Sequence, residues 1–147
     1  LLLEQLIQRL YILLDQIILG AFVAGLKAGY LFPTFPKMGN VWFPIEAFSL
    51  TPLWKNFTEN HAGIQLAHRI IAFVVAIYTV VLFYISRKTY LTKIQNKLFT
   101  WLIICVFFQF LLGVSTLLLN VQVVIAIAHQ AGAFLLFGTV LFLIHRL

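Results

Sequence analysis

The sequence has few of the residues that a water-exposed surface or a disulfide-bonded core needs. Cys105 is the only cysteine among 147 residues, which excludes a disulfide framework, a cysteine zinc cluster and a CxxC redox pair. Charged residues make up 10% of the chain and hydrophobic residues 63%, against roughly 25% and 45–50% in soluble domains. Too few charged side chains are present to cover a soluble protein, and the high hydrophobicity excludes intrinsic disorder. The composition therefore predicts an integral membrane protein.

Acidic residues are also scarce, with four Asp and Glu against ten Lys and Arg and a formal net charge of +6. In a membrane protein, such a basic excess is typical of the loops that orient helices in the bilayer. No basic stripe accompanies an exposed face, as a nucleic-acid-binding surface requires. We therefore expect membrane lipid, and no nucleic acid, as a partner.

Four apolar stretches are each long enough to cross a bilayer, which takes about 20 residues per helix. A more polar lead-in over residues 1–9 precedes the first of them. The sequence predicts an all-α integral membrane protein, a single up-down bundle of four transmembrane helices. The expected helices cover about residues 10–29, 64–85, 98–119 and 121–144.

The connections between these stretches differ in charge and composition. The short loop over 87–97 has no acid and four basic residues: Arg87, Lys88, Lys93 and Lys97. The positive-inside rule places this loop in the cytoplasm, together with both termini, near which Arg9 and Arg146 lie. The loop over 30–59, rich in proline and aromatic residues, is then expected outside as a structured cap at the bilayer interface, as is the tight turn at Asn120.

Two histidines are expected at the same depth in the membrane, where polar groups are costly and usually functional. His68 lies eight residues after Asn60, a good N-cap residue, and His129 lies nine residues after Asn120. At about 1.5 Å per residue, both lie roughly 12–14 Å along their helices from the outer side. The spacing predicts that both imidazoles line one site in the outer half of the bundle.

A pair of imidazoles at one depth in a helical bundle favours haem iron as the ligand. Zinc needs four ligands, and no third ligand is evident at this depth. A proton relay leaves the matched depth without an explanation, and the plainest alternative is two buried histidines hydrogen-bonded to backbone. His61 shares a face with His68 but lies one turn above it at the outer surface, and His145 lies at the cytoplasmic end, too far away to share a site.

The neighbours of the two histidines fit a planar anionic ligand. Arg69 needs an anionic partner in the bilayer, which a haem propionate or Glu59 would supply. Gln65 and Gln130 could hydrogen-bond a propionate or an imidazole. Small residues beside the histidines would let a flat macrocycle approach the backbone, or would serve helix packing alone: Gly63, Ala131, Gly132 and Ala133. On the first helix, Ala21, Gly25 and Gly29 share one face and would allow close helix approach.

Several short motifs, in this order along the four helices, resemble the haem A synthase family. They are Gly20-Ala-Phe-Val-Ala-Gly-Leu-Lys-Ala-Gly29; Thr34-Phe-Pro36 with Met38-Gly39; Asn56-Phe-Thr-Glu-Asn60 with Gln65-x-x-His68-Arg69; Leu112-Gly-Val-Ser-Thr-Leu117; and His129-Gln130-x-x-Ala133. The resemblance extends from about residue 20 to residue 133. Two positions depart from the family pattern: Pro33 replaces its usual Asn and Gln122 its frequent Pro.

The resemblance implies a fold and a reaction for the whole protein. The family has eight spanning helices in two similar four-helix bundles, and this chain resembles the second. That bundle holds haem b, with His68 and His129 as the axial ligands of an electron-transferring iron. The resemblance implies a membrane oxidoreductase that oxidises the methyl group of haem O to the formyl group of haem A for cytochrome oxidase. The first bundle, with the haem O substrate and an important glutamate, is expected ahead of residue 1 or on another chain, so we expect these residues alone to be inactive.

The resemblance also implies partners and a location. Candidate partners are haem O synthase and further copies of the chain, and the location is the bacterial inner membrane, or the mitochondrial inner membrane in a eukaryote. The lack of a loop cysteine pair resembles the cysteine-free proteobacterial and mitochondrial branch, and Cys105 reads as an apolar helix residue. Two other hypotheses stay open: a stand-alone bis-histidine cytochrome b for electron transfer, and a membrane protein without haem whose histidines only pack.

Overall fold

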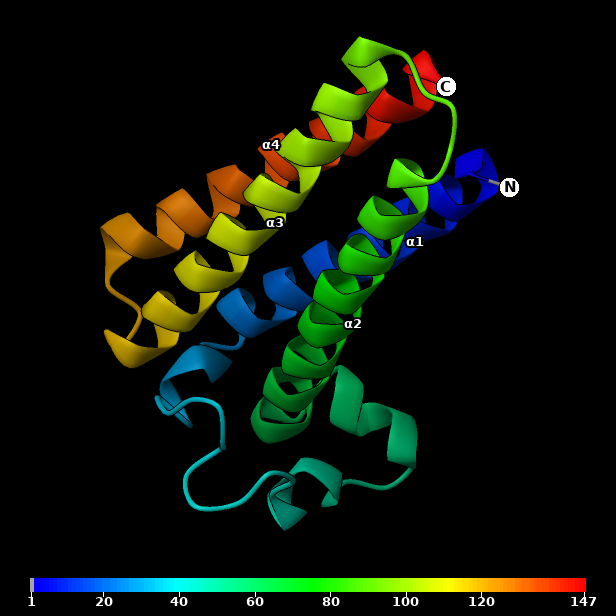
Figure 1. Cartoon of the computed structure of the whole chain (residues 1–147). Coiled ribbons are helices and arrows are strands. Elements are labelled where there is room, and N and C mark those ends of the chain that lie inside the picture. Colours follow the sequence, from blue (N-terminus) through cyan, green and yellow to red (C-terminus); the bar gives the residue numbers. More distant parts are fainter. Residues whose placement is uncertain (1) are drawn as a thin grey trace.

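The computed structural model describes residues 2–147 of the chain, and its secondary structure is helical (Figure 1). Four helices are long and apolar enough to cross a membrane, which confirms the predicted all-α class. Within residues 2–147 the only β-type pairing is an isolated bridge between Met38 and Val41. The four helices are α1 (Leu2–Gly25), α2 (His61–Arg87), α3 (Lys93–Leu118) and α4 (Val123–Arg146).

The helices run alternately up and down, so the chain ends lie beside the α2–α3 loop, and the long loop and the α3–α4 turn lie at the opposite end (Figure 1). Helix α1 packs against α2 and α4, and α3 packs against the same two helices, which closes a ring of four. We call the end with the chain termini the basic end and the other the loop end. That the basic end faces the cytoplasm stays a prediction.

The first helix begins earlier than expected. As described, it runs from Leu2 to Gly25 instead of spanning residues 10–29, so residues 2–9 of the predicted lead-in are helical. The reason is that Leu6 packs into the apolar core of the bundle, and its neighbours Glu4, Gln5 and Gln8 are good helix formers. Helix α3 likewise begins at Lys93, five residues before the predicted start, because Thr92 and Gln95 form a capping box.

Arg9, whose charge was expected near the cytoplasmic N-terminus, is buried inside the bundle. Its side chain is 1% exposed, and its Nη1 donates to the Val75 carbonyl at 3.3 Å and to the Thr79 hydroxyl. Its Nε and Nη2 have no hydrogen-bond partner among residues 2–147. The basic end therefore contains one cation within an otherwise apolar core, formed by Leu6, Leu13, Leu82, Phe99, Leu102, Val106, Leu136, Val140 and Leu143.

The long loop between α1 and α2 is folded against the start of α2, as the expected structured cap requires. It contains three short 3-10 helices, Ala28–Tyr30, Ile45–Phe48 and Leu53–Phe57. Asn56 is fully buried and bonds the loop to itself, because its Nδ2 donates to the Leu50 and Leu53 carbonyls and its Oδ1 accepts from the Leu50 amide. Asn60 caps α2 as predicted, accepting from the amides of Ala62 and Gly63.

The turn between α3 and α4 has two consecutive left-handed residues, Asn120 (φ 50°) and Val121 (φ 56°). This conformation is unfavourable for a β-branched residue. The Val121 amide donates to the Thr116 carbonyl at 2.7 Å, and the Val121 side chain packs over Gly29, where an added Cβ would lie 3.1 Å from Val121 Cγ2. Among the small residues of the first predicted span, Gly29 thus allows a close approach of Val121. A Cβ added at Gly25 would have no neighbouring atom within 4 Å, so Gly25 allows no such contact.

Candidate functional site

The loop end of the bundle encloses a cavity of about 810 Å³ that all four helices line. His68 on α2 and His129 on α4 both line it. They lie seven and six residues after the starts of their helices, or roughly 9–11 Å along them at about 1.5 Å per residue. The structure therefore brings the two histidines to one cavity at matched depth. His61 and His145 are exposed and do not line this cavity.

Each cavity histidine packs against a glycine of the preceding long helix. An added Cβ at Gly20 on α1 would lie 3.2 Å from His68 Cε1, and one at Gly113 on α3 would lie 2.9 Å from His129 Cε1. Both distances are shorter than ordinary carbon contacts of ~3.5–4.0 Å. Only glycine at these two positions leaves enough space for the imidazole ring beside it.

A glutamine four residues before each glycine contacts the same histidine. Gln16 Nε2 lies 3.3 Å from His68 Nε2, and Gln109 Nε2 donates to the His129 backbone carbonyl at 2.7 Å. A Gln-x-x-x-Gly pattern thus occurs once on α1 and once on α3, with its histidine on the next long helix each time. The lone pair of an imidazole nitrogen binds one partner at a time. A metal bound at His68 Nε2 would therefore replace the hydrogen bond between Gln16 and that nitrogen.

Several buried polar atoms around the cavity have no hydrogen-bond partner among residues 2–147. Buried polar atoms in native proteins are nearly always paired, so this group of atoms indicates a site for a polar or metal-containing ligand. Within the described residues, no group of three or more His, Cys, Asp or Glu could hold a bare metal ion. The arrangement fits a planar metal cofactor that brings its own equatorial ligands. The atoms are His68 Nδ1, His129 Nδ1, Gln16 Oε1, Gln65 Oε1, Gln109 Oε1 and Arg69 Nε.

Arg69 and Gln65 line the cavity and also hold the long loop. Arg69 donates to the carbonyls of Phe32 at 2.8 Å and Lys37 at 3.2 Å, and Gln65 Nε2 donates to the Phe32 carbonyl at 3.1 Å. Arg69 therefore has backbone carbonyls as its partners. The proposed pairing with Glu59 is wrong, because Glu59 pairs with Lys55 at 4.0 Å.

The remaining expected site residues separate into two groups. Gln130 and Ala133 line the cavity. Gly63 faces the carbonyls of Asn56 and Ala47, and Gly132 faces Gln109, so for these two glycines the packing interpretation is correct. Among residues 2–147, no acidic residue lines the cavity, and the two cations that line it are Arg69 and Lys27.

Sequence reasoning missed Gln16, Gln109, Gly113 and Lys27, and an aromatic cluster. Phe35, Phe73 and Phe110 line the cavity with ring centroids 5.4–6.1 Å apart. A usable signal was present, because a glutamine in a long apolar helix is costly and therefore a functional candidate. For the aromatic cluster no such signal exists, because nothing in the sequence distinguishes its three members from the other phenylalanines of the fifteen.

The fold and the cavity define a four-helix membrane-type bundle with a paired-histidine site between its helices. The chain belongs to the COX15-CtaA family of cytochrome oxidase assembly proteins, whose model matches residues 5–141. This confirms the resemblance seen in the motifs at the level of the family.

Curated relatives agree with this assignment. The chain is 38% identical over 132 residues to the Heme A synthase of Parvibaculum lavamentivorans, covering 90% of this chain and 37% of the relative. It is 41% identical to the Heme A synthase of Wolbachia sp. subsp. Brugia malayi (88% and 37% covered) and 38% identical to Heme A synthase COX15 of Bos taurus (87% and 31% covered). The chain thus spans about a third of the length of these relatives. No solved structure matches it significantly.

Proposed function

We propose that this chain is the haem b-binding half of a haem A synthase, with His68 and His129 as the axial ligands of the haem iron. The observation that carries the proposal is that both imidazoles line one cavity, and that the buried Nδ1 of each has no hydrogen-bond partner among residues 2–147. The cavity volume of about 810 Å³ lies within the ~300–1,000 Å³ of typical ligand sites. The residues present therefore fit a haem.

The cationic residues of the cavity match the carboxylates of such a ligand. Arg69 and Lys27 line the wall near the long loop, and none of the described residues that line the cavity is an acid. Gln65 and Gln130 supply amide groups beside them. We assign the propionates to this end of the cavity, with Arg69 as the principal partner, because its Nε has no partner among the described residues.

The protein's own residues position the ligands and keep the site apolar. Gly20 and Gly113 set the space for the two rings, and Gln109 holds the α4 backbone at His129. The phenylalanine cluster and the apolar helix faces exclude water, which supports a controlled redox potential. When bound, the haem iron supplies one-electron transfer.

The proposed activity of the whole protein is the oxidation of the haem O methyl group to the formyl group of haem A. Support comes from the relatives, which are named Heme A synthase. Since the chain spans about a third of their length, we propose that a second four-helix bundle binds haem O and completes the enzyme. The loop over residues 30–59 contains no cysteine, which supports assignment to the branch without a loop cysteine pair. We place the enzyme in a bacterial or mitochondrial inner membrane.

Absorption spectroscopy of the detergent-purified chain tests the haem assignment. We expect a low-spin b-type spectrum that His68→Ala and His129→Ala each abolish or convert to high spin, whereas the exposed controls His61→Ala and His145→Ala leave it unchanged. A folded chain that takes up no added haem, or a spectrum indifferent to both cavity substitutions, refutes the ligand assignment.

Complementation tests the activity separately. In a strain that lacks its own haem A synthase, we expect no haem A from this chain alone and restored haem A when the second bundle is supplied. Haem A formed by the chain alone would show that no second bundle is needed. Haem bound without haem A in either case would favour the stand-alone cytochrome b.

A further inference from the structure

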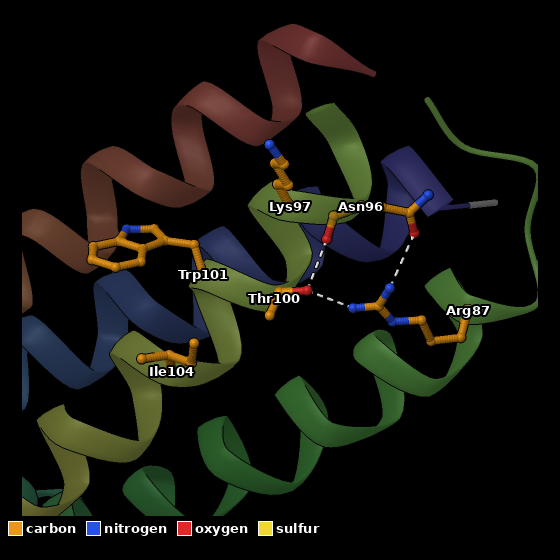
Figure 2. Close-up of a pocket in the computed structure, with 6 residues that line it drawn as sticks. All are labelled: Arg87, Asn96, Lys97, Thr100, Trp101 and Ile104. Carbon is orange, nitrogen blue, oxygen red and sulfur yellow. Dashed lines mark hydrogen bonds between the residues drawn. The ribbon is translucent and has the colours of Figure 1, made fainter. Parts of the chain in front are cut away.

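A second pocket lies at the basic end of the bundle, where α2 ends and α3 begins (Figure 2). It has a volume of about 280 Å³ and shares no lining residue with the histidine cavity. Residues from both helices line it, and the haem proposal uses none of them. They are Arg87, Asn96, Lys97, Thr100, Trp101 and Ile104.

Among the described residues, two cations and no anion line the pocket. The Arg87 guanidinium reaches from α2 to α3, where it donates to the Asn96 side-chain oxygen at 3.5 Å and to the Thr100 hydroxyl, and it lies 4.5 Å from the Phe83 ring centre (Figure 2). Both acceptors are neutral. Lys97 has no hydrogen bond or ion pair with residues 2–147, and no Asp or Glu follows Glu59 in the sequence. Two uncompensated positive charges at one pocket favour a ligand with a negative charge.

The pocket is also apolar along α3. Trp101 and Ile104, one and two turns beyond Lys97, are 56% and 41% exposed and continue the pocket towards the middle of the helix. Tryptophan is enriched at the membrane–water interface. A ligand that uses the whole pocket therefore has an anionic group at the helix ends and an apolar chain below it. Inorganic phosphate would use only the charged part.

We propose that this pocket binds the phosphate group of an acidic phospholipid. Arg87 and Lys97 contact the phosphate, Asn96 and Thr100 orient the guanidinium, and Trp101 and Ile104 pack against an acyl chain. Basic pockets between spanning helices on the positively charged side are suited to such headgroups. The lipid would hold the α2–α3 connection at the membrane surface.

Quenching of Trp101 by brominated lipids tests this proposal. In a chain carrying Trp42→Phe and Trp54→Phe, both exposed loop residues, Trp101 is the one tryptophan left. We compare phosphatidylcholine vesicles containing equal fractions of acyl-brominated phosphatidylglycerol or acyl-brominated phosphatidylcholine, at constant ionic strength. We expect stronger quenching by the phosphatidylglycerol. Equal quenching by the two lipids overturns the proposal.

Charge variants show whether the preference belongs to this pocket. Lys97→Gln should reduce the preference about fivefold, equivalent to the roughly 1 kcal/mol of one basic residue near an anionic surface, and Arg87→Gln with Lys97→Gln should abolish it. Lys97→Gln leaves the Arg87 hydrogen bonds intact, so it tests the charge without removing a helix contact. The matched control is Lys93→Gln, an exposed cation of the same end that does not line the pocket.

Two outcomes would overturn the proposal that this pocket binds a phospholipid. An equal loss of preference in Lys93→Gln would show that the basic end attracts acidic lipid without a defined pocket. Loss of the preference on adding excess inorganic phosphate at constant ionic strength would assign the pocket to a free anion. Persistence of the preference in phosphate, with selective loss in Lys97→Gln, supports the phospholipid.

Discussion

Gly113 on α3 lies against the His129 imidazole, so Gly113→Ala tests whether the position of that ring decides haem binding. The new Cβ would lie 2.9 Å from His129 Cε1. Carbon atoms pack at ~3.5–4.0 Å, so the ring or the helix must move by roughly 0.6–1.1 Å. Displacing groups that orient a metal ligand typically lowers metal affinity by about 10–100-fold. We expect haem affinity to fall within that range.

The assay is a haem titration of the purified chain followed at the Soret band, with the reduced spectrum recorded at saturation. Gly138→Ala on α4 is the matched control, because it adds the same methyl group where nothing lies within 4 Å. Alanine is a better helix former than glycine by up to about 1 kcal/mol, so the control should bind haem normally and unfold at a higher temperature. Gly20→Ala, with a 3.2 Å contact to His68, should have a smaller effect than Gly113→Ala.

The reasoning fails if Gly113→Ala binds haem as tightly as Gly138→Ala and shows the same spectrum. That result would mean either that the His129 ring moves freely by this distance or that His129 does not hold the iron. His129→Ala separates the two explanations, since it affects haem binding only in the first.

Three further predictions concern the scaffold. Arg9→Met should raise the unfolding temperature in detergent, because it removes a buried cation with only neutral partners; a lower temperature would contradict this. Gly63→Ala should destabilise the docked loop by about 1–3 kcal/mol, since its methyl group would overlap two loop carbonyls, and limited proteolysis should then cut the loop faster than in the unsubstituted chain. In a Cys105→Ala background, Tyr90→Cys should be labelled only from the cytoplasmic side and Ile45→Cys only from the outside; the reverse pattern would invert the topology.

The four membrane spans were predictable because the signal is one of composition. Long apolar runs identify helices in a bilayer, where backbone groups must bond within the segment. Helix ends were less predictable, because the polar residues Glu4, Gln5 and Gln8 interrupt the hydropathy signal although they favour a helix. Packing of Leu6 into the core decided that α1 continues to Leu2.

The residues of the candidate site also differ in how far the sequence predicts their positions and partners. Matched depth of His68 and His129 followed from the sequence, since the rise per residue converts a spacing into a distance. The partner of Arg69 did not, because the Phe32 carbonyl reaches it only through the path of a folded loop. The carboxylate of Glu59 was nearer in sequence, yet it pairs with Lys55 on the same loop.

The sequence by itself determined the membrane class, the four helices, the depth of the histidine pair and the basic character of one end. These follow from composition and from the fixed geometry of a helix along its axis. The tertiary structure alone decided which residues meet across helices: Gly20 with His68, Gly113 with His129, and Arg87 with Thr100. The physical reason is that helix rotation and separation depend on the packing of all four helices together, which no single segment encodes.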